Sequence, residues 1–362
     1  METKNKKIKV LYTIPNFDTA GSGKVLFDLA KGLDKEKFKV VIACSNDKGA
    51  FFEEVKKLGF PIFIRPITKS LKPYYSLLFR LRENINFIKK NNIDIVHSWH
   101  WSSDWTEAIA ARLGGAKFVY TKKAMTWGNI HWKIKSFLSN FIITINEEMK
   151  NYFPSKKAQK LIPLGLDTNY YNPKIFQKED SIIFKIITVA NLVPVKGIEV
   201  LIKSIQVLNN INIHLEILGD DRAEYASELK RMVLDLGLQN QITFLGKHTD
   251  VRPFLAASDL YVIPTLNEGR KEGMPMALVE AMCMAIPVLG SNISGINFVL
   301  KDFPELLFEA KNEKELAKKL STIYNKSKAK REVVGKTLRA YCVNNFSYEK
   351  FIAEHEKLYL SL

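Results

Sequence analysis

Two glutamates eight residues apart are the side chains of this sequence best suited to holding an elongated polar ligand. They flank the segment Glu272-Gly-Met-Pro-Met-Ala-Leu-Val-Glu280. Pro275 suits the first position of a helix because its φ is fixed and it lacks an N–H group, so a helix is predicted to start there. Glu280 then lies in the second turn, roughly 8 to 10 Å beyond Glu272 at about 1.5 Å per residue. Carboxylates so far apart cannot share one metal ion, but each can accept hydrogen bonds from vicinal hydroxyl groups.

The same segment offers a position for a phosphate group. Met276, Ala277 and Leu278 are predicted to present backbone N–H groups without intrahelical partners, at the positive end of the helix dipole. Gly273 would let the backbone approach a sugar where any Cβ would intrude. Taken alone, the segment also fits an ordinary capped helix with a solvated Glu280, so the rest of the chain is needed to choose between the two interpretations.

Composition indicates a globular protein of two domains. The chain has 362 residues, of which 46% are hydrophobic and 25% charged, and this length allows a large core. No stretch approaches 18 consecutive apolar residues, and the Lys-rich start leads directly into a short strand, unlike a signal peptide. We therefore expect a cytoplasmic protein. Cys44, Cys283 and Cys342 are too few and too widely spaced for a disulfide framework or a metal cluster.

The net charge of +16 and the pI near 9.5 favour anionic partners. The basic residues are dispersed, so we do not expect nucleic acid. Local concentrations fall in the first half, at Lys56-Lys57, 69–90, Lys122-Lys123, 133–135 and 156–160. They are interleaved with Tyr74, Tyr75, Leu77, Leu78, Phe79, Phe87, Trp127, Trp132, Phe137 and Phe141. This mixture suits peripheral contact with the inner face of an anionic membrane, although a solvated basic face over core aromatics is equally compatible.

Short apolar runs alternate with longer helical patterns in two series, which is typical of parallel sheets built from βαβ units. The first series predicts strands at 8–14, 39–43, 62–64, 93–96, 118–120 and 141–145. The second predicts strands at 184–189, 213–218, 242–245, 260–263 and 286–289. We therefore predict an α/β protein of two doubly wound domains, residues 1–164 and 165–345, with ligands at the carboxyl ends of the strands. An amphipathic helix at 346–362 is predicted to cross back onto the first domain.

With this layout, the chain resembles the retaining glycosyltransferases of family 4, which have the GT-B architecture of two facing Rossmann-like domains. The resemblance spans nearly the whole chain and depends on three motifs: 272–282 followed by Ala285-Ile-Pro-Val288, Asn191-Leu-Val-Pro-Val-Lys-Gly197, and Leu161-Ile-Pro-Leu-Gly-Leu-Asp167. Weaker matches are 19–23, 94–100, Gly219-Asp220 and Phe346-Ser-Tyr348. The resemblance implies transfer of a hexose from a nucleotide-diphosphate sugar to an acceptor hydroxyl with retention of the anomeric configuration.

The resemblance also implies roles for individual residues. Glu272 matches the acid that contacts the hydroxyls of the donor sugar, and Glu280 matches the one that holds the ribose. Lys196 matches the cation that neutralises the leaving diphosphate. Gly273, Met274, Pro275 and Met276 complete the donor loop. UDP-sugars are the favoured donors and GDP-sugars the alternative, since these residues do not distinguish uracil from guanine.

Asn191 departs from the family pattern, which usually has Arg at this position, five residues before the lysine. Asn191 is still expected in the donor site, but one cation at the diphosphate is missing. Candidate substitutes are Arg222, Lys247, Arg270 and Lys271, of which Arg270 ranks first because the inserted run 268–271 lies close to the donor loop.

A second departure lies in the first domain, where the family often has a histidine near the reacting centre. This chain has Lys123 there, which can donate to an acceptor or a phosphate but cannot act as a near-neutral imidazole. His97 and His100 follow the predicted strand 93–96 at its carboxyl end. Either could line the cleft, and His100 is the better candidate for polarising a hydroxyl.

The Gly21-Ser22-Gly23-Lys24 run is not a P-loop, because that motif needs Gly at position 18 and Ser or Thr at 25, where this chain has Asp18 and Val25. A glycine turn between the first strand and helix would still let the backbone approach a phosphate. In the family this loop faces the donor diphosphate, so Gly21 and Ser22 are predicted to contact it. Gly23 stands where a Glu is common.

We expect no metal and no cofactor. No His or Cys cluster has ligand spacing, and Asp220-Asp221 is interpreted as a turn or helix cap. Because the family's GT-B enzymes generally use helix dipoles and cations in place of a metal, activity is expected to survive EDTA.

Two alternatives stay open at this stage: a nucleotide-sugar epimerase of the same architecture, and a catalytically silent binding or scaffold protein. A Rossmann dehydrogenase is disfavoured, since G-x-G-x-x-G with a later acidic residue is missing. The basic aromatic segments favour a glycan or lipid-linked acceptor at the membrane, as in surface polysaccharide assembly.

Overall fold

The structure is a computed structural model that describes residues 6–17, 20–268 and 272–362. Its contacts divide the chain into two compact units. The first unit runs to Gly165 and also contains Tyr348–Leu362, and the second is Leu166–Ser347. The prediction from sequence had placed the corresponding boundaries at 164 and 345. Within the described ranges, no helix is both long and apolar enough to cross a membrane.

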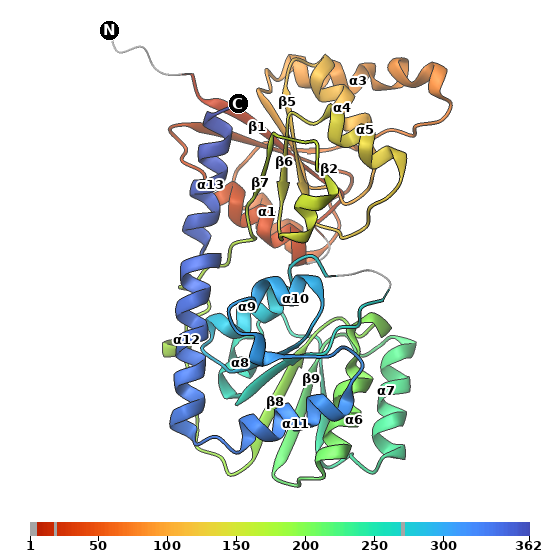
Figure 1. The fold of residues 1–362 in the computed structure, drawn as a ribbon. Helices are drawn as coiled ribbons and strands as arrows, with labels where there is room; N and C mark the ends of the chain where they lie inside the picture. Colours follow the sequence, from red (N-terminus) through yellow and green to blue (C-terminus); the bar gives the residue numbers. More distant parts are fainter. Residues whose placement is uncertain (1–5, 18–19, 269–271) are drawn as a thin grey trace. The chain divides into compact units, whose positions relative to one another are not determined.

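The first unit is built on a seven-stranded parallel sheet in the order β3-β2-β1-β4-β5-β6-β7 (Figure 1). Its strands are β1 (Ile8–Ile14), β2 (Phe38–Cys44), β3 (Ile62–Ile64), β4 (Ile95–Ser98), β5 (Lys117–Lys122), β6 (Phe141–Thr144) and β7 (Gln159–Leu161). All strands run parallel, but the order in which successive strands are added to the sheet reverses between β1 and β4, where Thr13 lies opposite Ser98. In doubly wound sheets, ligands bind at the carboxyl ends of the strands beside this switch point.

Helices cover both faces of this sheet, which explains why its central strands are apolar on both sides. The helices are α1 (Ala20–Gly32), α2 (Ala50–Lys56), α3 (Leu77–Lys90), α4 (Thr106–Leu113), α5 (Ile130–Leu138) and α13 (Tyr348–Leu360). Figure 1 shows α1 beside α13, away from α3, α4 and α5. The approach of α1 to α13 is close, because a Cβ on Gly32 would lie 1.9 Å from Cδ1 of Ile352.

The second unit has a six-stranded parallel sheet in the order β10-β9-β8-β11-β12-β13. Its strands are β8 (Phe184–Val189), β9 (Ile213–Leu218), β10 (Ile242–Gly246), β11 (Leu260–Ile263), β12 (Val288–Ser291) and β13 (Leu307–Phe308). The helices are α6 (Ile198–Leu208), α7 (Glu224–Asp235), α8 (Arg252–Ala257), α9 (Met276–Cys283), α10 (Ser294–Val299), α11 (Glu313–Tyr324) and α12 (Lys328–Phe346). The switch point here lies between β8 and β11, and α11 packs on α6 while α12 packs on α9.

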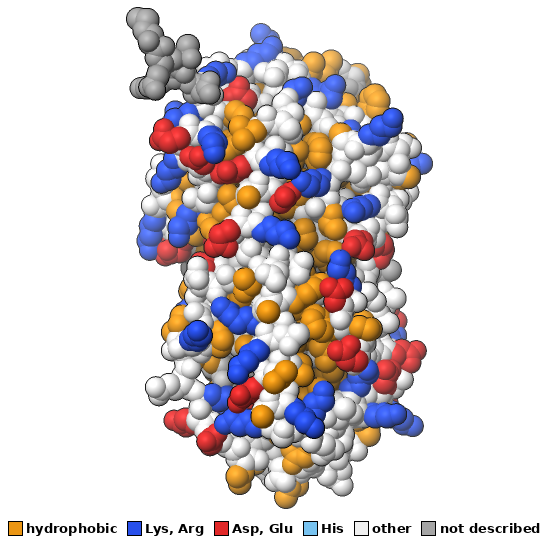
Figure 2. All heavy atoms as spheres, turned by 60° about the vertical axis from the view of Figure 1, so that its left-hand side comes forward, with side chains coloured by type: hydrophobic (Ala, Val, Ile, Leu, Met, Phe, Trp, Pro, Cys, Tyr) orange, Lys and Arg blue, Asp and Glu red, His pale blue; other side chains and the backbone are white. Residues whose placement is uncertain are grey.

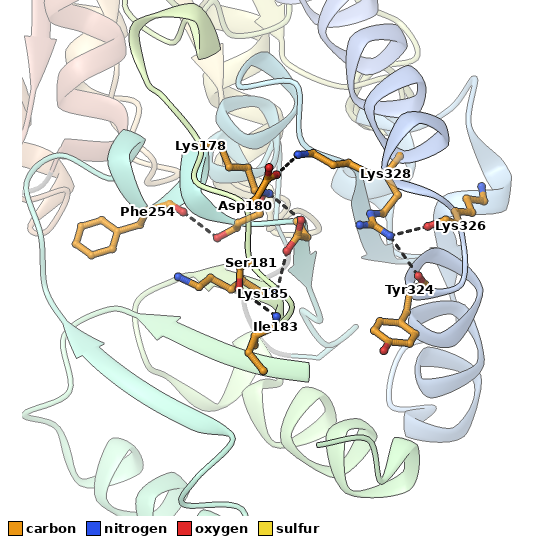
Figure 3. Close-up of polar contacts among 12 residues, drawn as sticks. Lys178, Asp180, Ser181, Ile183, Lys185, Phe254, Tyr324, Lys326 and Lys328 are labelled. Atoms are coloured by element: carbon orange, nitrogen blue, oxygen red, sulfur yellow. Dashed lines mark hydrogen bonds and ion pairs between the residues drawn. The ribbon is translucent and has the colours of Figure 1, made fainter. Parts of the chain in front are cut away.

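Ion pairs and hydrogen bonds fasten the amino-terminal ends of β8 and β11 (Figure 3). The Asp259 carboxylate accepts from Nζ of Lys178 at 2.8 Å and from the backbone N–H of Lys185 at 2.9 Å. Lys328 of α12 pairs with Asp180 in the same region. This end of the sheet is therefore occupied by structural contacts, which leaves the opposite, carboxyl-terminal edge for ligands.

The structure confirms the predicted fold class and five of the strands at the predicted bounds: 8–14, 62–64, 184–189, 213–218 and 260–263. The strands predicted at 93–96 and 286–289 each lie two residues later in the structure. The short strands β7 and β13 were not predicted. Basic side chains are spread over the face that Figure 2 shows and are interspersed with acidic ones, as the dispersed sequence pattern predicted.

Candidate active site

Lys196 and Glu272 form an ion pair at the carboxyl edge of the second sheet. Lys196 comes from the loop that follows β8, and Glu272 from the loop that follows β11. Because β8 and β11 are neighbours at the switch point, their following loops meet there. The two side chains are 22% and 21% exposed, so both can reach a ligand while most of each side chain is fixed by its surroundings. The structure thus joins two residues that the sequence had singled out separately.

A tight backbone contact fixes the position of Lys196. The residue ends the 3-10 turn Pro194–Lys196, and Gly197 follows with φ 63° and ψ 28°. A Cβ at Gly197 would lie 2.3 Å from the carbonyl oxygen of Pro264. The N–H of Leu266 also donates to the carbonyl of Val195 at 2.8 Å. The loops after β8 and β11 are therefore tied to each other directly behind the ion pair.

The Glu272 loop lies against the start of α10, which follows β12. A Cβ at Gly295 would come within 2.4 Å of the carbonyl oxygen of Glu272 and 2.9 Å of that of Gly273. Only glycine leaves room for this approach, so Gly295 sets the height of the loop above the sheet. Its role was not predicted, because nothing near Gly295 in the sequence indicates contact with residue 272.

Helix α9 begins one residue later than predicted. Pro275 has φ −79° and ψ 103° and precedes the helix, whose first residue is Met276. The prediction of three N–H groups without intrahelical partners was wrong for Leu278, because its N–H donates to the Pro275 carbonyl at 3.2 Å. Met276 and Ala277 supply the first two amides of α9. Gly273, Met274 and Pro275 are buried, so the prediction that they contact a donor now concerns their backbone atoms.

Glu280 is half-buried in α9 and is not the solvated residue of the simpler interpretation. Burial, the charge of Glu280 and a hydrogen bond to its carboxylate together raise the pKa of the Tyr171 hydroxyl. Tyr261 lies near the same carboxylate, and burial followed by the charge of Glu280 raises its pKa as well. The Tyr261 hydroxyl is buried and has no hydrogen-bond partner among the described residues. Neither tyrosine was predicted to belong to the site.

Two of the four candidate substitutes for the missing cation at position 191, Arg222 and Lys247, lie within the described residues. Asn191 is exposed after β8. Arg222 donates to Asp220 through Nε at 2.7 Å, and this contact lowers the pKa of Asp220 to about 2. Lys247 is exposed. Arg270, the substitute ranked first, and Lys271 lie outside the described residues.

His97 does not line the carboxyl edge of the first sheet, so that part of the prediction was wrong. Strand β4 continues to Ser98 and places His97 inside the unit, with no exposed surface. Its Nδ1 is 2.6 Å from the hydroxyl of Tyr359 in α13, and its Nε2 is 2.7 Å from Oγ1 of Thr121. His97 is therefore a packed structural residue.

His100 and Lys123 do lie at the carboxyl edge of the first sheet. Nζ of Lys123 donates to the carbonyl of Trp99 at 2.5 Å and lies 4.9 and 5.4 Å from the ring centres of Trp99 and Trp101. His100 is 8% exposed. Burial lowers its pKa, the Glu107 carboxylate opposes that shift, and the charges of Lys135 and Lys123 add to it. Burial therefore favours the neutral form of the imidazole.

Matches to two protein families together cover most of the chain. Residues 173–340 match the family described as "Glycosyl transferases group 1" and residues 19–170 match "Glycosyltransferase Family 4". The chain belongs to the family 4 glycosyltransferases.

Known glycosyltransferases are similar to this chain over most of its length. The chain is 24% identical to the UDP-Gal:alpha-D-GlcNAc-diphosphoundecaprenol alpha-1,3-galactosyltransferase of Escherichia coli, over 100% of this chain and 99% of that protein. It is 24% identical to the capsular polysaccharide biosynthesis glycosyltransferase CapH of Staphylococcus aureus, over 83% of this chain and 86% of that protein. A glycosyltransferase from Rickettsia africae superposes with a TM-score of 0.86 at 19% identity, covering 98% of each chain. Anabaena HepE in complex with UDP and glucose superposes with a TM-score of 0.81 at 18% identity, covering 98% of this chain and 100% of that chain. The similarity to these structures confirms the GT-B fold.

In this glycosyltransferase, a buried carboxylate that was not predicted lies next to His100. Glu107 in the first turn of α4 has no exposed surface. It accepts hydrogen bonds from Oγ1 of Thr13 and, at 2.6 Å, from Oγ of Ser98. Because Thr13 and Ser98 lie near the carboxyl ends of β1 and β4, Glu107 ties the two strands together at the switch point of the first unit.

The prediction of a glycine turn between β1 and the first helix was wrong. Gly21 and Ser22 lie in the first turn of α1, rather than in a turn that precedes the helix. An added Cβ at Gly21 would meet nothing within 4 Å, whereas Gly23 packs on Phe17. The first-turn amides of a helix still suit an anion, so Gly21 and Ser22 stay predicted contacts of the donor.

No group of three or more His, Cys, Asp or Glu side chains within the described ranges is arranged to hold a metal ion. Asp221 instead pairs with Lys230 at 2.7 Å, as Asp220 does with Arg222.

Proposed function

We propose that this family 4 glycosyltransferase transfers a hexose, with retention of configuration, from a nucleotide-diphosphate sugar to a hydroxyl group. The observation that carries the proposal is the meeting of Lys196 with Glu272 at the switch point, beside the start of α9. A nucleotide sugar has complementary groups at the matching places: phosphate oxygens for the ammonium and α9 amides, and sugar hydroxyls for the carboxylate.

Each site residue of the second unit has one part in the proposed reaction. The Lys196 ammonium and the amides of Met276 and Ala277 stabilise the negative charge that grows on the diphosphate. The Glu272 carboxylate accepts hydrogen bonds from hydroxyls of the donor sugar and orients the ring. The Glu280 carboxylate, held by Tyr171, accepts from the ribose hydroxyls at the other end of the donor.

The proposed step breaks the bond between the anomeric carbon and the β-phosphate oxygen and forms a bond to the acceptor oxygen on the same face. The acceptor proton passes to the leaving phosphate oxygen, so the products are the glycoside and a nucleoside diphosphate. No separate general base is required. Lys123 and the neutral His100 are proposed to contact the acceptor hydroxyl, and Gly21 and Ser22 the diphosphate. The reaction is proposed to need no metal and to persist in EDTA.

UDP-sugars are the favoured donors and GDP-sugars the alternative. The Escherichia coli relative is named for UDP-Gal, and the Anabaena protein is in complex with UDP and glucose. The acceptor is proposed to be a glycan or a lipid-linked saccharide in surface polysaccharide assembly at the cytoplasmic face of the membrane. The same Escherichia coli protein acts on a diphosphoundecaprenol-linked sugar, and the Staphylococcus aureus protein is named for capsule biosynthesis.

A donor screen followed by a product assay tests the proposal. Thermal stabilisation by a panel of UDP- and GDP-sugars identifies the donor, and NMR of the product gives the anomeric configuration. Glu272→Ala is expected to abolish turnover with an unchanged fold, whereas Glu268→Ala, an exposed acid paired with Lys311, serves as the matched control. Unchanged transfer by Glu272→Ala would refute the assignment. Formation of an epimerised donor without acceptor would identify an epimerase instead.

A further inference from the structure

The first unit exposes several large apolar side chains on the helices that cover one face of its sheet. Tyr75 is 92% exposed, Phe79 77% and Leu78 62%, all in the segment that leads into α3 or in its first turn. On α5, Phe137 is 83% exposed and Ile130 is 61% exposed. Both helices pack against α4. Apolar side chains exposed in such a group indicate a surface that contacts a partner.

Helix α3 is apolar on two faces, and only one of them is used inside the unit. Leu77, Leu81 and Ile88 are buried in the core beneath the helix. Leu78 and Phe79 of α3, with Tyr75 in the 3-10 turn before it, form a second, exposed apolar face. The basic Arg82 extends this face by one turn. Since the core already accounts for the first face, the exposed face requires another explanation. In Figure 1, α3 lies at the outer side of this unit, beyond α4.

The segment that carries the exposed tyrosines has a fixed backbone. The Arg80 guanidinium donates to four consecutive carbonyls, including those of Lys72 at 3.1 Å and Pro73 at 2.6 Å. Tyr74 and Tyr75 follow directly in a 3-10 turn. The apolar face is thus held in one shape by polar contacts and does not result from a loose loop.

Basic side chains surround this apolar face. Residues 69–90 contain six Lys or Arg and a single acid, Glu83, whose carboxylate already pairs with Arg65 at 2.9 Å and Lys69 at 3.5 Å. Lys72, Arg82, Lys89 and Lys90 are exposed. On α5, Lys133 lies on the same face as Ile130 and Phe137 by helical spacing. The exposed surface therefore combines large apolar side chains with basic side chains around them.

We propose that this surface, residues 72–90 of α3 and its preceding turn together with Ile130, Lys133 and Phe137 of α5, docks on an anionic lipid bilayer. The aromatic and aliphatic groups enter the headgroup region, and the basic groups contact anionic lipid headgroups. A second copy of the chain is a poorer occupant, because two such surfaces would bring like charges together. The inference is independent of the donor chemistry proposed above and states where the enzyme works.

Vesicle flotation with the full-length protein tests the inference. Wild-type protein is expected to bind vesicles of phosphatidylcholine and phosphatidylglycerol, to bind pure phosphatidylcholine vesicles weakly, and to be released by salt. Tyr75→Ser/Leu78→Ser/Phe79→Ser and Arg82→Glu/Lys89→Glu/Lys90→Glu should each reduce binding about tenfold or more. The matched control is Ile182→Ser/Ile211→Ser, which changes side chains of the second unit that are 93% and 82% exposed and should leave binding unchanged.

The outcomes separate docking from catalysis and from other occupants. Because all these positions are exposed, thermal midpoints and turnover of a water-soluble acceptor should match those of the wild type. Failure of the wild type to bind anionic vesicles, or equal binding by the two surface variants, would overturn the inference. It would also be overturned if the wild type formed a dimer in the absence of vesicles and the serine variant did not, because the surface would then be a contact between copies.

Discussion

Nζ of Lys196 contacts Oε1 of Glu272 although 76 positions separate the two residues in the sequence. A glycine without room for a side chain lies next to each residue. Gly197 follows Lys196 in the chain, and Gly295 lies against the backbone of Glu272. The backbone on both sides of the pair is therefore positioned by close contacts among the loops after β8 and β11 and the start of α10.

Removing the Lys196 charge is expected to slow the chemical step more than donor binding. Lys196→Met keeps the aliphatic stem but leaves the developing charge on the diphosphate without its cation, so kcat should fall about 100-fold to 1000-fold with a smaller change in KM. Steady-state release of nucleoside diphosphate measures both constants. Lys203→Met, an exposed position on α6, is the control, and an unchanged kcat for Lys196→Met would contradict the assigned role.

Gly295→Ala is expected to lower both thermal stability and kcat. The new methyl group would come within 2.4 Å of the Glu272 carbonyl oxygen, and backbone atoms cannot move away as a flexible side chain would. The destabilisation should be about 1 to 3 kcal/mol, typical of overpacking. Denaturant unfolding and donor kinetics measure the two effects. Asn297→Ala, exposed on the same helix, should change neither, and full activity of Gly295→Ala would show that the loop position is unimportant.

Two buried tyrosines near Glu280 should respond differently to loss of their hydroxyls. Tyr171→Phe removes a hydrogen bond to the Glu280 carboxylate, so the donor KM should rise severalfold and stability should fall by about 1 to 2 kcal/mol. Tyr261→Phe removes a buried hydroxyl that has no partner among the described residues and should be neutral or stabilising. Donor titration and urea unfolding compare the pair. Equal effects of the two substitutions would argue against a specific role for Tyr171.

Stability is expected to fall as the pH drops from about 6.5 towards 4. Burial lowers the pKa of His355 to about 4 and also lowers that of His97. The unfolded chain therefore takes up protons on these imidazoles near pH 6.5, whereas the folded chain takes up the His355 proton only near pH 4. More protons bound in the unfolded state means that the free energy of unfolding decreases as the pH falls through this window.

Urea unfolding at several pH values tests this dependence. His355→Leu should reduce the dependence of the free energy of unfolding on pH between pH 6.5 and 4, whereas His248→Gln, at an exposed position, should preserve it. If His355→Leu kept the wild-type slope, the acid sensitivity would have another source.

The sequence predicted best those features that have a local signal. Strands β1, β8, β9 and β11 are rich in apolar and β-branched residues, with at most single polar residues between them, so their bounds could be read directly. Strand β4 was placed two residues early because Ile93 is apolar, whereas Asp94 in fact caps the sheet by accepting the N–H of Lys9 at 2.8 Å. His97 and Ser98 are polar but buried in the strand, and polarity alone suggested a loop. The error in the strand caused the error about His97.

The same distinction between local and distant signals applies to the residues of the candidate site. Lys196, Glu272 and Glu280 lie in short motifs with a physical rationale, and the structure places Lys196 beside Glu272. Tyr171, Gly295 and Glu107 could not be found in this way, because each acts on a residue far away in the chain or on another strand. Pro275 was predicted one position too far into the helix, since its fixed φ does not determine ψ, which is 103° here.

The hydrogen bond between His97 and Tyr359 has a consequence for biosynthesis. Helix α13 covers Tyr12 and His97, so the helical layer that it forms with α1 stays incomplete until the ribosome has synthesised the whole of the second unit. Residues 166–347 are contiguous, so the second unit needs no segment from a later part of the chain to complete it. The part of the chain that is translated first is therefore completed last, and its apolar surface around β1 and β4 is the region that chaperones have reason to bind in the meantime.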